Sequence, residues 1–416
     1  MRLLFISDNF PPEVNAPATR TWEHCLEWVK DGIDVTVITC FPNFPEGKIF
    51  RGYRNKLYSI EFLEGIRIVR VFTYITANKG FIKRTIDYIS FGVAACVSGL
   101  FVKTDLIVAT SPQFFAAVWA RRLAFVKRRP WVMEVRDLWP ESVKSVGAIS
   151  NEWLLVYFRW LELRLYRSAS CIVTLTDSFK EHISSRGIDP AKVFVIKNGA
   201  NLALFRPKEK NLILSDKLGL DGKFVVGFIG TLGMAHKLDF IIEAASKIRD
   251  PDIHFLFIGA GAERENLEAI IKKAKPLNVS MYGMIPKDQV PDYLSIVDVS
   301  LINLRKSENF KTVLPSKIFE SSAMGKPILL GVDGEARKLV ELYSAGIFFE
   351  PENEAEFISK LLLLRNDNSL YDNMKSGCRK LAADFDRKRL AREMKELLKE
   401  VEGKSQNRKK AKYYNN

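Results

Sequence analysis

The sequence predicts an α/β protein made of two parallel-sheet domains, and three observations support this prediction. The chain has 416 residues, whereas one soluble domain commonly holds about 100–200 residues. It opens with an apolar strand, a Pro- and Asn-rich loop, a helix and a second strand, which is typical of a parallel sheet. A second series of apolar strands and helices begins at Phe224.

The elements of the first half are expected where short apolar runs stand between Gly, Pro, Asn or Asp. A helix over residues 22–30 ends at Asp31-Gly32, and a hairpin over residues 61–72 turns at Glu64-Gly65. Further strands are expected at residues 3–7, 35–39, 106–109, 131–135, 171–175 and 193–196. Residues 1–203 form the first predicted domain.

The second half repeats the pattern after a charged linker within residues 202–220. Residues 204–385 form the second predicted domain, and a helix over 386–402 returns to the first one. The tail 403–416 has five basic residues and no acidic residue, so it is expected to be disordered. Strands of the second domain are expected at residues 224–229, 253–258, 279–282, 297–301 and 327–331.

The charge leaves several classes of partner open. The formal net charge is +14, and residues 1–200 hold 27 Lys/Arg against 19 Asp/Glu. Such a surface attracts nucleic acid, anionic lipid or a phosphorylated substrate. Five scattered cysteines without a CxxC pair indicate a reducing compartment and no structural zinc. The first apolar run is interrupted by Asp8, so no signal peptide is expected.

Two stretches of the first half are unusually apolar. Residues 86–102 contain one acidic residue and no basic one, and residues 153–166 interleave aromatic residues with arginines. The first stretch is short for a spanning helix, which needs about 20 apolar residues. Both stretches fit core helices of a large domain, or a surface that enters the membrane interface with basic residues on lipid phosphates.

The stretch KTVLPSKIFESSAMG, residues 311–325, predicts a helix start suited to phosphate. Pro315 ends an extended run, and Ser316 stands where an N-cap belongs. A helix start has free N–H groups and a partial positive charge, and Lys317 adds a full charge. Glu320, one turn further, is placed to accept hydrogen bonds from sugar hydroxyls. The alternative is an ordinary capped helix with a solvated Lys and Glu.

Two glycine turns of the same domain follow strands. Gly230-x-x-Gly233 follows the strand over 224–229, and Gly259-x-Gly261 follows the strand over 253–258. Glycine lets backbone N–H groups approach a phosphate closely. Together with the helix start at Ser316, these turns are expected to face one crevice at the carboxyl edge of a sheet.

Arg136 and Asp137 directly follow the strand over 131–135. Asp137 is placed to bind a ligand, and the Arg136 fork suits a carboxylate or a phosphate. An internal Arg–Asp pair that supports a loop under Trp139 is the alternative. No Ser-His-Asp order, HExxH or Walker A motif is present, and neither a metal nor a cofactor is expected.

Eight segments, in this order, resemble those of the nucleotide-sugar-dependent glycosyltransferases of family 4. The likeness covers about residues 1–402 and includes bacterial acetamido-deoxysugar (N-acetylfucosamine) transferases of O-antigen and capsule assembly. It implies a GT-B fold, in which two Rossmann-like domains face each other across a cleft, and retaining, metal-independent chemistry. The segments are FPPEVNAPATR, TSP at Thr110, VRDLWPES at Val135, NGAN at Asn198, GFIGTLG at Gly227, FIGAGAER at Phe257, LPSKIFESSAMGKPIL at Leu314 and AGIFFEPEN at Ala345.

The resemblance implies roles for residues of the second domain. Glu320 matches the carboxylate that holds the donor's ribose, while Thr312 stands at the family's other Glu, which contacts the sugar. Thr231 and His236 stand at the Arg and Lys that neutralise the diphosphate. Lys237 and Lys317 are therefore expected to serve as catalytic cations for the diphosphate. Further donor contacts are expected from Gly230, Gly233, Gly259, Gly261, Ile285, Val313, Leu314 and Ser316.

The resemblance also implies roles in the first domain. Asn15-Ala16 stands at the family's Gly-Gly loop, which lies near the diphosphate. Arg136 and Asp137 stand at a catalytic His-Asp pair whose His contacts the donor's 6-hydroxyl. The loss of that His suits a 6-deoxy sugar.

The expected activity is transfer of a sugar, an N-acetylated and 6-deoxy hexosamine, from a UDP donor to a polyprenyl-diphosphate-linked glycan. The departing diphosphate would accept the acceptor's proton. The enzyme is expected in the cytoplasm, on the inner face of the membrane, without a nucleic-acid partner. A GT-B epimerase or phosphorylase, and a non-catalytic protein that binds nucleic acid or anionic membrane, are the alternatives.

Overall fold

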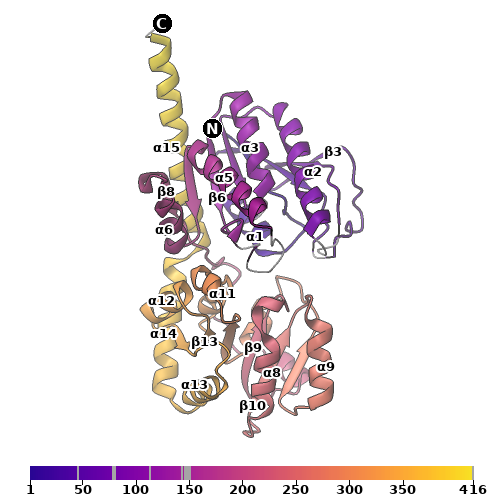
Figure 1. The fold of residues 1–416 in the computed structure, drawn as a ribbon. Helices are drawn as coiled ribbons and strands as arrows, with labels where there is room; N and C mark the ends of the chain where they lie inside the picture. The colour runs from indigo at the N-terminus through magenta and orange to yellow at the C-terminus, as the bar shows by residue number, and fades with distance from the viewer. Residues whose placement is uncertain (45, 77–80, 112–113, 142–143, 145–150, 415–416) are drawn as a thin grey trace. The chain divides into compact units, whose positions relative to one another are not determined.

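The computed structural model describes residues 1–44, 46–76, 81–111, 114–141, 144 and 151–414, and only the backbone of 81–82 and 408–414. Pro112 and Ser142 of the quoted segments, and the last two residues of the tail, lie outside this set. The chain forms two compact units, Met1–Lys197 with Arg387–Asn416, and Asn198–Asp386 (Figure 1). The expected borders at residues 203 and 386 lie within a few residues of these.

The first unit is built on an eight-stranded sheet in the order β3-β4-β2-β1-β5-β6-β7-β8. All neighbours are parallel except β3 and β4, which form the expected hairpin at Glu64-Gly65. The strands are β1 (Arg2–Ile6), β2 (Asp34–Cys40), β3 (Tyr58–Leu63), β4 (Ile66–Val71), β5 (Leu106–Thr110), β6 (Trp131–Val135), β7 (Cys171–Thr174) and β8 (Val193–Val195).

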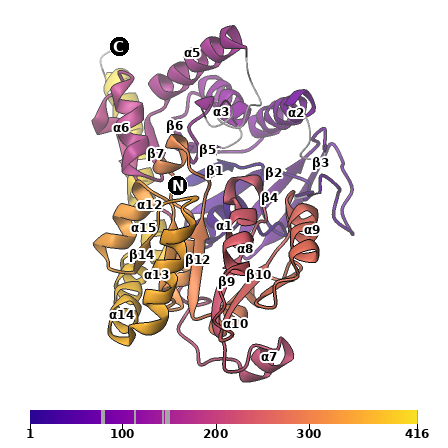
Figure 2. The ribbon, with the colours of Figure 1, turned by 60° about the horizontal axis from the view of Figure 1, so that its bottom comes forward.

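Helices cover both faces of this sheet. β1 shows why, because Leu4 and Ile6 join one apolar core while Leu3 and Phe5 join the other. Helices α2, α3 and α5 lie side by side over the first core (Figure 2), and α1 and α15 pack on the second. The helices are α1 (Ala16–Lys30), α2 (Phe81–Leu100), α3 (Phe114–Lys127), α5 (Glu152–Ser168), α6 (Asp177–Ser185), η1 (Pro190–Lys192) and α15 (Arg387–Tyr414).

The two apolar stretches form α2 and α5, and each is buried on one side only. Phe91 of α2 and Leu155 of α5 are fully buried in the core, as core helices require. Val97 of α2 and Trp153 of α5 are exposed. Within the part of the chain that the structure describes, no helix is long and apolar enough to cross a membrane.

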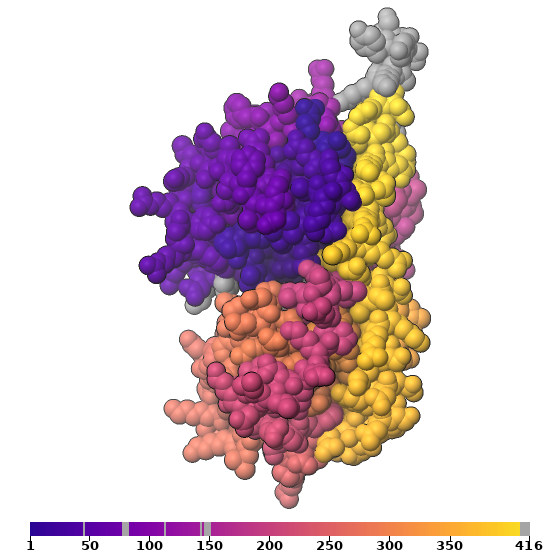
Figure 3. Space-filling model, turned by 180° about the vertical axis from the view of Figure 1, so that it is seen from behind, coloured from indigo at the N-terminus to yellow at the C-terminus, as the bar shows by residue number. Residues whose placement is uncertain are grey.

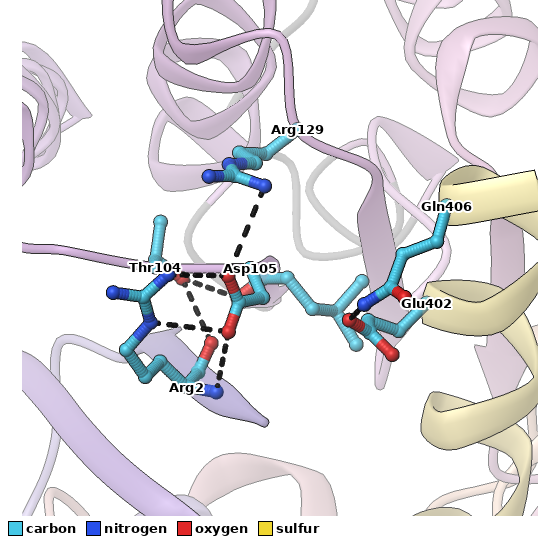
Figure 4. Close-up of polar contacts among 7 residues, drawn as sticks. Arg2, Thr104, Asp105, Arg129, Glu402 and Gln406 are labelled. Carbon is cyan, nitrogen blue, oxygen red and sulfur yellow. Dashed lines mark hydrogen bonds and ion pairs between the residues drawn. The ribbon is translucent and has the colours of Figure 1, made fainter. Parts of the chain in front are cut away.

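The tail differs from its expectation, because α15 continues as a helix to Tyr414. Composition alone predicted disorder, but Lys, Arg, Gln and Ala are good helix formers and extend a helix whose first half is anchored. Trp28 Nε1 donates to the carbonyl of Ala391 at 2.8 Å, and Figure 3 shows α15 lying along the N-terminal residues. Figure 4 shows Glu402 and Gln406 bonded to each other along this helix.

Figure 4 also shows the amino-terminal edge of the sheet, where an ion pair joins the starts of β1 and β5. Asp105 accepts hydrogen bonds from the main-chain N, the Nε and the Nη2 of Arg2, at 2.9, 3.1 and 2.7 Å. These bonds, and the positive charge of Arg2, lower the pKa of Asp105 to about 2. Arg129 lies 3.8 Å from the same carboxylate.

The second unit has a parallel six-stranded sheet in the order β11-β10-β9-β12-β13-β14, with strands β9 (Phe224–Ile229), β10 (Ile253–Ile258), β11 (Val279–Tyr282), β12 (Val299–Asn303), β13 (Ile328–Gly331) and β14 (Gly346–Phe348). Its helices are α7 (Leu212–Lys217), η2 (Met234–His236), α8 (Leu238–Ser246), α9 (Arg264–Ala274), α10 (Val290–Ser295), η3 (Glu308–Thr312), α11 (Lys317–Ala323), α12 (Glu335–Leu342), α13 (Glu354–Asn366) and α14 (Asn368–Asp384).

The strand order of each sheet marks where a ligand is expected. In the first unit the order reverses at β1, which lies between β2 and β5, and in the second at β9, which lies between β10 and β12. Ligands of open parallel sheets bind outside the carboxyl ends of the strands at such a reversal. The prediction of two parallel-sheet α/β domains is thus confirmed, and the candidate residues follow β1, β6, β9 and β10.

Candidate functional site

Two glycine loops meet at the carboxyl edge of the second sheet. Gly230 follows β9 with φ +149°, and Gly259 follows β10 with φ +154°, both in the region that favours glycine. A Cβ at Gly259 would lie 1.8 Å from the carbonyl oxygen of Gly230. The two loops therefore approach each other this closely only because Gly259 lacks a side chain.

Lys317, the first residue of α11, extends its side chain over Gly230. A Cβ on Gly230 would lie 2.5 Å from Lys317 Cε and 2.7 Å from its Nζ. The ammonium lies 4.7 Å from the centre of the Phe228 ring, and no carboxylate of the described residues lies within 4.0 Å of it. Burial lowers the Lys317 pKa to about 8. A desolvated cation above a glycine loop is suited to an anion.

His236 closes the same loop in its neutral form. Its Nδ1 lies 3.1 Å from the carbonyl oxygen of Asn303, and Asn303 Nδ2 donates back to the carbonyl of His236 at 2.8 Å. Burial, and then the charge of Lys317, lower the His236 pKa to about 3. The Nδ1–H donates to the carbonyl, so Nε2 is left as an acceptor.

Lys237 is less available than the sequence led us to expect. It has a left-handed backbone with φ +47°, and its Nζ binds Asp239 at 2.6 Å. Of the two lysines predicted for the diphosphate, Lys237 is paired with Asp239, whereas Lys317 has no counterion among the described residues. Thr231 and Gly233 lie between Gly230 and Lys237 on the loop that follows β9, and Thr231 is exposed.

Glu320 pairs with Lys287, a residue that sequence analysis missed. Their side chains are 15% and 27% exposed, and the Lys287 ammonium lies 4.8 Å from the centre of the Phe205 ring. Lys287 follows β11, where no motif marks it, so no sequence signal pointed to this contact. Ile285, two residues earlier, packs against the apolar cluster under β9 and β10.

The segment before α11 differs from a simple capped helix. Ser316 has helical backbone angles and makes no side-chain cap bond. The first turn already begins at Pro315, whose carbonyl accepts from the N–H of Ile318 at 3.1 Å. Thr312 ends η3 and its Oγ1 donates to the carbonyl of Asn309. Val313 and Leu314 pack against the core below α11.

The first unit brings together residues from the ends of three strands. The Asn15 side chain caps α1 by accepting from the N–H of Ala18 at 2.9 Å, and Ala16 begins that helix. Ser111, after β5, accepts from the N–H of Arg136 at 2.8 Å and of Asp137 at 3.4 Å. Both site residues after β6 are therefore held by the end of β5.

Arg136 and Asp137 do not form the internal pair that the sequence left open. No ion pair within 4.0 Å joins either side chain to a described residue of opposite charge. Burial raises the Asp137 pKa to about 6 and lowers the Arg136 pKa to about 10. Glu134, one residue before them, is bound at 2.9 Å by the buried Arg20.

Two family descriptions match successive parts of the chain. The description "Glycosyl transferase 4-like domain" matches residues 15–199, and "Glycosyl transferases group 1" matches residues 212–381. The chain belongs to the family 4 glycosyltransferases.

Relatives agree with this assignment. The transferase is 24% identical over 390 residues to Escherichia coli K12 WcaI, a glycosyl transferase assigned to colanic acid biosynthesis, covering 89% of this chain and 94% of the relative. It is 26% identical over 232 residues to the E. coli UDP-Gal:alpha-D-GlcNAc-diphosphoundecaprenol alpha-1,3-galactosyltransferase, covering 54% and 58%. Anabaena HepE in complex with UDP matches with TM-score 0.69 and 17% identity, covering 96% and 100%. The likeness to HepE shows only that the two proteins share the GT-B fold.

Membership of the family confirms the predicted enzyme class, a glycosyltransferase. Within the described ranges, no group of three or more His, Cys, Asp or Glu side chains is arranged to hold a metal ion. The cationic and glycine-rich elements around Lys317 form the candidate site of the second unit.

We predict that Lys287 holds the Glu320 carboxylate in place. A double-mutant cycle with Lys287→Met and Glu320→Gln should give a coupling of about 1 kcal/mol in urea unfolding, because the pair is largely shielded from water. The Lys208–Asp292 pair, whose side chains are 38% and 43% exposed, is the matched control. A Lys287–Glu320 coupling no larger than that of the control would contradict the prediction.

Proposed function

We propose that this transferase moves an N-acetylated, 6-deoxy hexosamine from a UDP donor to a lipid-linked glycan, with retention of configuration and without a metal. The single observation that carries the proposal is the Lys317 ammonium above Gly230, which has no ion-pair partner among the described residues. The proposed setting is cell-surface polysaccharide assembly, O-antigen or capsule, on the cytoplasmic face of the membrane.

The second unit supplies what a nucleoside diphosphate needs. Lys317 would bind the diphosphate, and the N–H groups of the Gly230 loop would line it. The positive charge of Lys317 would stabilise the departing diphosphate more than the intact donor. This electrostatic effect lowers the barrier to sugar transfer. Anabaena HepE, a protein of the same fold, binds UDP, which supports uracil as the base of the donor nucleotide.

The donor's ribose is assigned to Glu320. Lys287 binds this carboxylate, and a carboxylate has enough lone pairs to accept from a ribose hydroxyl at the same time. Because Glu320 is engaged in this way, the diphosphate oxygen is the proposed acceptor of the incoming hydroxyl's proton.

The acceptor is assigned to the first unit. One relative is named for transfer to a diphosphoundecaprenol-linked sugar, and another is assigned to colanic acid biosynthesis. Asp137, which follows β6, is the proposed contact for the sugars, since burial raises its pKa to about 6. Its raised pKa is what a carboxyl group shows when a closed site removes it from water.

The proposed membrane-binding surface is the layer formed by α2, α3 and α5 (Figure 2). At the ends of these helices, Phe101, Phe125 and Trp153 are 83%, 84% and 87% exposed. Residues 81–103, 114–129 and 152–168 hold eleven Lys/Arg and three Asp/Glu. Exposed aromatic groups among cations suit an interface rich in anionic lipid.

We predict that UDP stabilises the protein in EDTA and that Lys317→Met weakens UDP binding about 10- to 100-fold, as expected for a lost charge-assisted hydrogen bond. Affinity should also fall as the pH rises through about 8, because free Lys317 then loses the proton that the anion requires. In Lys317→Met this part of the pH dependence should vanish. Calorimetric titration checks both expectations.

A pair of glycine variants serves as the control. Gly230→Ala should weaken UDP binding about tenfold, since its Cβ would displace Lys317. Gly222→Ala also places Ala at positive φ, +69°, but meets no atom within 4 Å, so it should leave UDP affinity unchanged. Unaltered UDP binding in both Lys317→Met and Gly230→Ala would refute the diphosphate site.

A second prediction concerns the sugar. Turnover with the 6-deoxy counterpart of UDP-GlcNAc should exceed turnover with UDP-GlcNAc about tenfold in kcat/KM, because Arg136 replaces the family's His that contacts the donor's 6-hydroxyl. The product's anomeric configuration, read by NMR, should match the donor's. Better use of UDP-GlcNAc would reject the 6-deoxy assignment, and an inverted product would reject retention.

The membrane surface is tested by flotation with vesicles. Binding to phosphatidylglycerol vesicles should exceed binding to phosphatidylcholine vesicles and fall with salt. Phe125→Ser with Trp153→Ser should reduce it about tenfold or more, because each change removes an apolar side chain from the interface. Ile213→Ser, at an 84% exposed site on the second unit, is the control. Equal flotation of both variants would place the surface elsewhere.

A further inference from the structure

Arg136 is a buried cation without a carboxylate partner among the described residues. Arg136 is the residue directly after β6, at the carboxyl edge of the first sheet, and it is 8% exposed. The only side-chain hydrogen bond given by the described residues is a long one, 3.4 Å, from Nη1 to the carbonyl of Pro17. No carboxylate of those residues lies within 4.0 Å of its guanidinium. A guanidinium has five N–H donors, so most of its capacity is unused.

Two other arginines of the same unit show what a structural buried arginine looks like here. Arg20 is 1% exposed, and it binds Glu134 through Nε and the carbonyls of Lys197 and Ile196 through Nη1 and Nη2. Arg70 is also 1% exposed and binds Glu61 together with two main-chain carbonyls. Each uses all three nitrogens of its fork. Arg136 therefore differs from the arginines whose role is to support the fold.

The acids beside Arg136 in the sequence form no ion pair with it. Glu134 is bound by Arg20. Asp137 makes no ion pair with a described residue, and burial raises its pKa to about 6. Burying an unpaired charge costs free energy that a bound anion would recover.

The position of Arg136 is that of a ligand contact. Its N–H is fixed by Ser111 after β5, and its side chain reaches the carbonyl of Pro17 in the first turn of α1, the helix that follows β1. The strand order of the sheet reverses at β1, and ligands of parallel sheets bind at the carboxyl edge beside such a reversal.

We propose that the Arg136 guanidinium binds a sugar carboxylate, so that the first unit recognises an acidic sugar in the acceptor glycan. The inference rests on the proposed function, which assigns the acceptor to this unit. A planar carboxylate matches the guanidinium fork with two parallel hydrogen bonds. A phosphate dianion fits less well, because the carboxyl group of Asp137 is the next residue and would repel its second charge.

The test uses three probes, glucuronate, glucose and glucose 1-phosphate, with the full chain at millimolar ligand and ligand-observed NMR. Wild-type protein should bind glucuronate at least tenfold more tightly than glucose, and more tightly than glucose 1-phosphate. In Arg136→Gln the advantage of glucuronate over glucose should vanish, and Arg136→Lys should keep part of it. The matched control is Arg122→Gln, on the exposed side of α3, which should bind all three probes like wild type.

Three outcomes would overturn the proposal. They are equal binding of glucuronate and glucose by wild type, unchanged glucuronate binding in Arg136→Gln, and tighter binding of glucose 1-phosphate, which would mark a phosphate site. A UDP titration of each variant reports on the second unit separately. Normal UDP binding without carboxylate preference would reject only the Arg136 site, whereas absence of UDP binding in wild type would reject the proposed function.

Discussion

Parallel strands end on one edge of their sheet, and both candidate sites follow from this constraint. In the second unit it brings the ends of β9 and β10 so close that a Cβ at Gly259 would lie 1.8 Å from the Gly230 carbonyl oxygen. In the first unit it sets the ends of β5 and β6 side by side, so that the Ser111 hydroxyl accepts hydrogen bonds from the main-chain N–H groups of both Arg136 and Asp137. At each edge, the candidate site contains a buried cation, Lys317 or Arg136, that has no ion-pair partner among the described residues.

Buried cations that stabilise the fold differ in their contacts from the buried cations of the candidate sites. Arg20 and Arg70 are satisfied by a carboxylate and by main-chain carbonyls, and these contacts hold segments together that are far apart in sequence. Lys317 and Arg136 have no such set of acceptors among the described residues, and burial lowers the pKa of both. A protein keeps a poorly compensated cation inside only where something else supplies the negative charge. That makes these two residues the most informative positions in their units.

Sequence analysis succeeded where a local pattern decides the structure. Short apolar runs located the strands except β14, Glu64-Gly65 located the hairpin, and the glycine turns after 224–229 and 253–258 located the loops under Lys317. It failed where the outcome depends on distant contacts. The pairing of Lys287 with Glu320 joins residues 33 positions apart, and no motif marks it. The helical tail was missed because charge composition ignores the packed start of α15. The side-chain cap predicted at Ser316 does not form, because the turn already begins at Pro315.

The return of the chain to its first unit has a consequence for the order of folding. Met394 and Leu398 of α15 are fully buried in the core that also holds Leu3, Phe5 and Trp28. During synthesis, the part of this face that α15 covers stays exposed until α15 itself has been made. The second unit, Asn198–Asp386, is continuous and needs no such late segment. The unit that begins first is therefore completed last, and its nascent form exposes an apolar face that a chaperone would recognise.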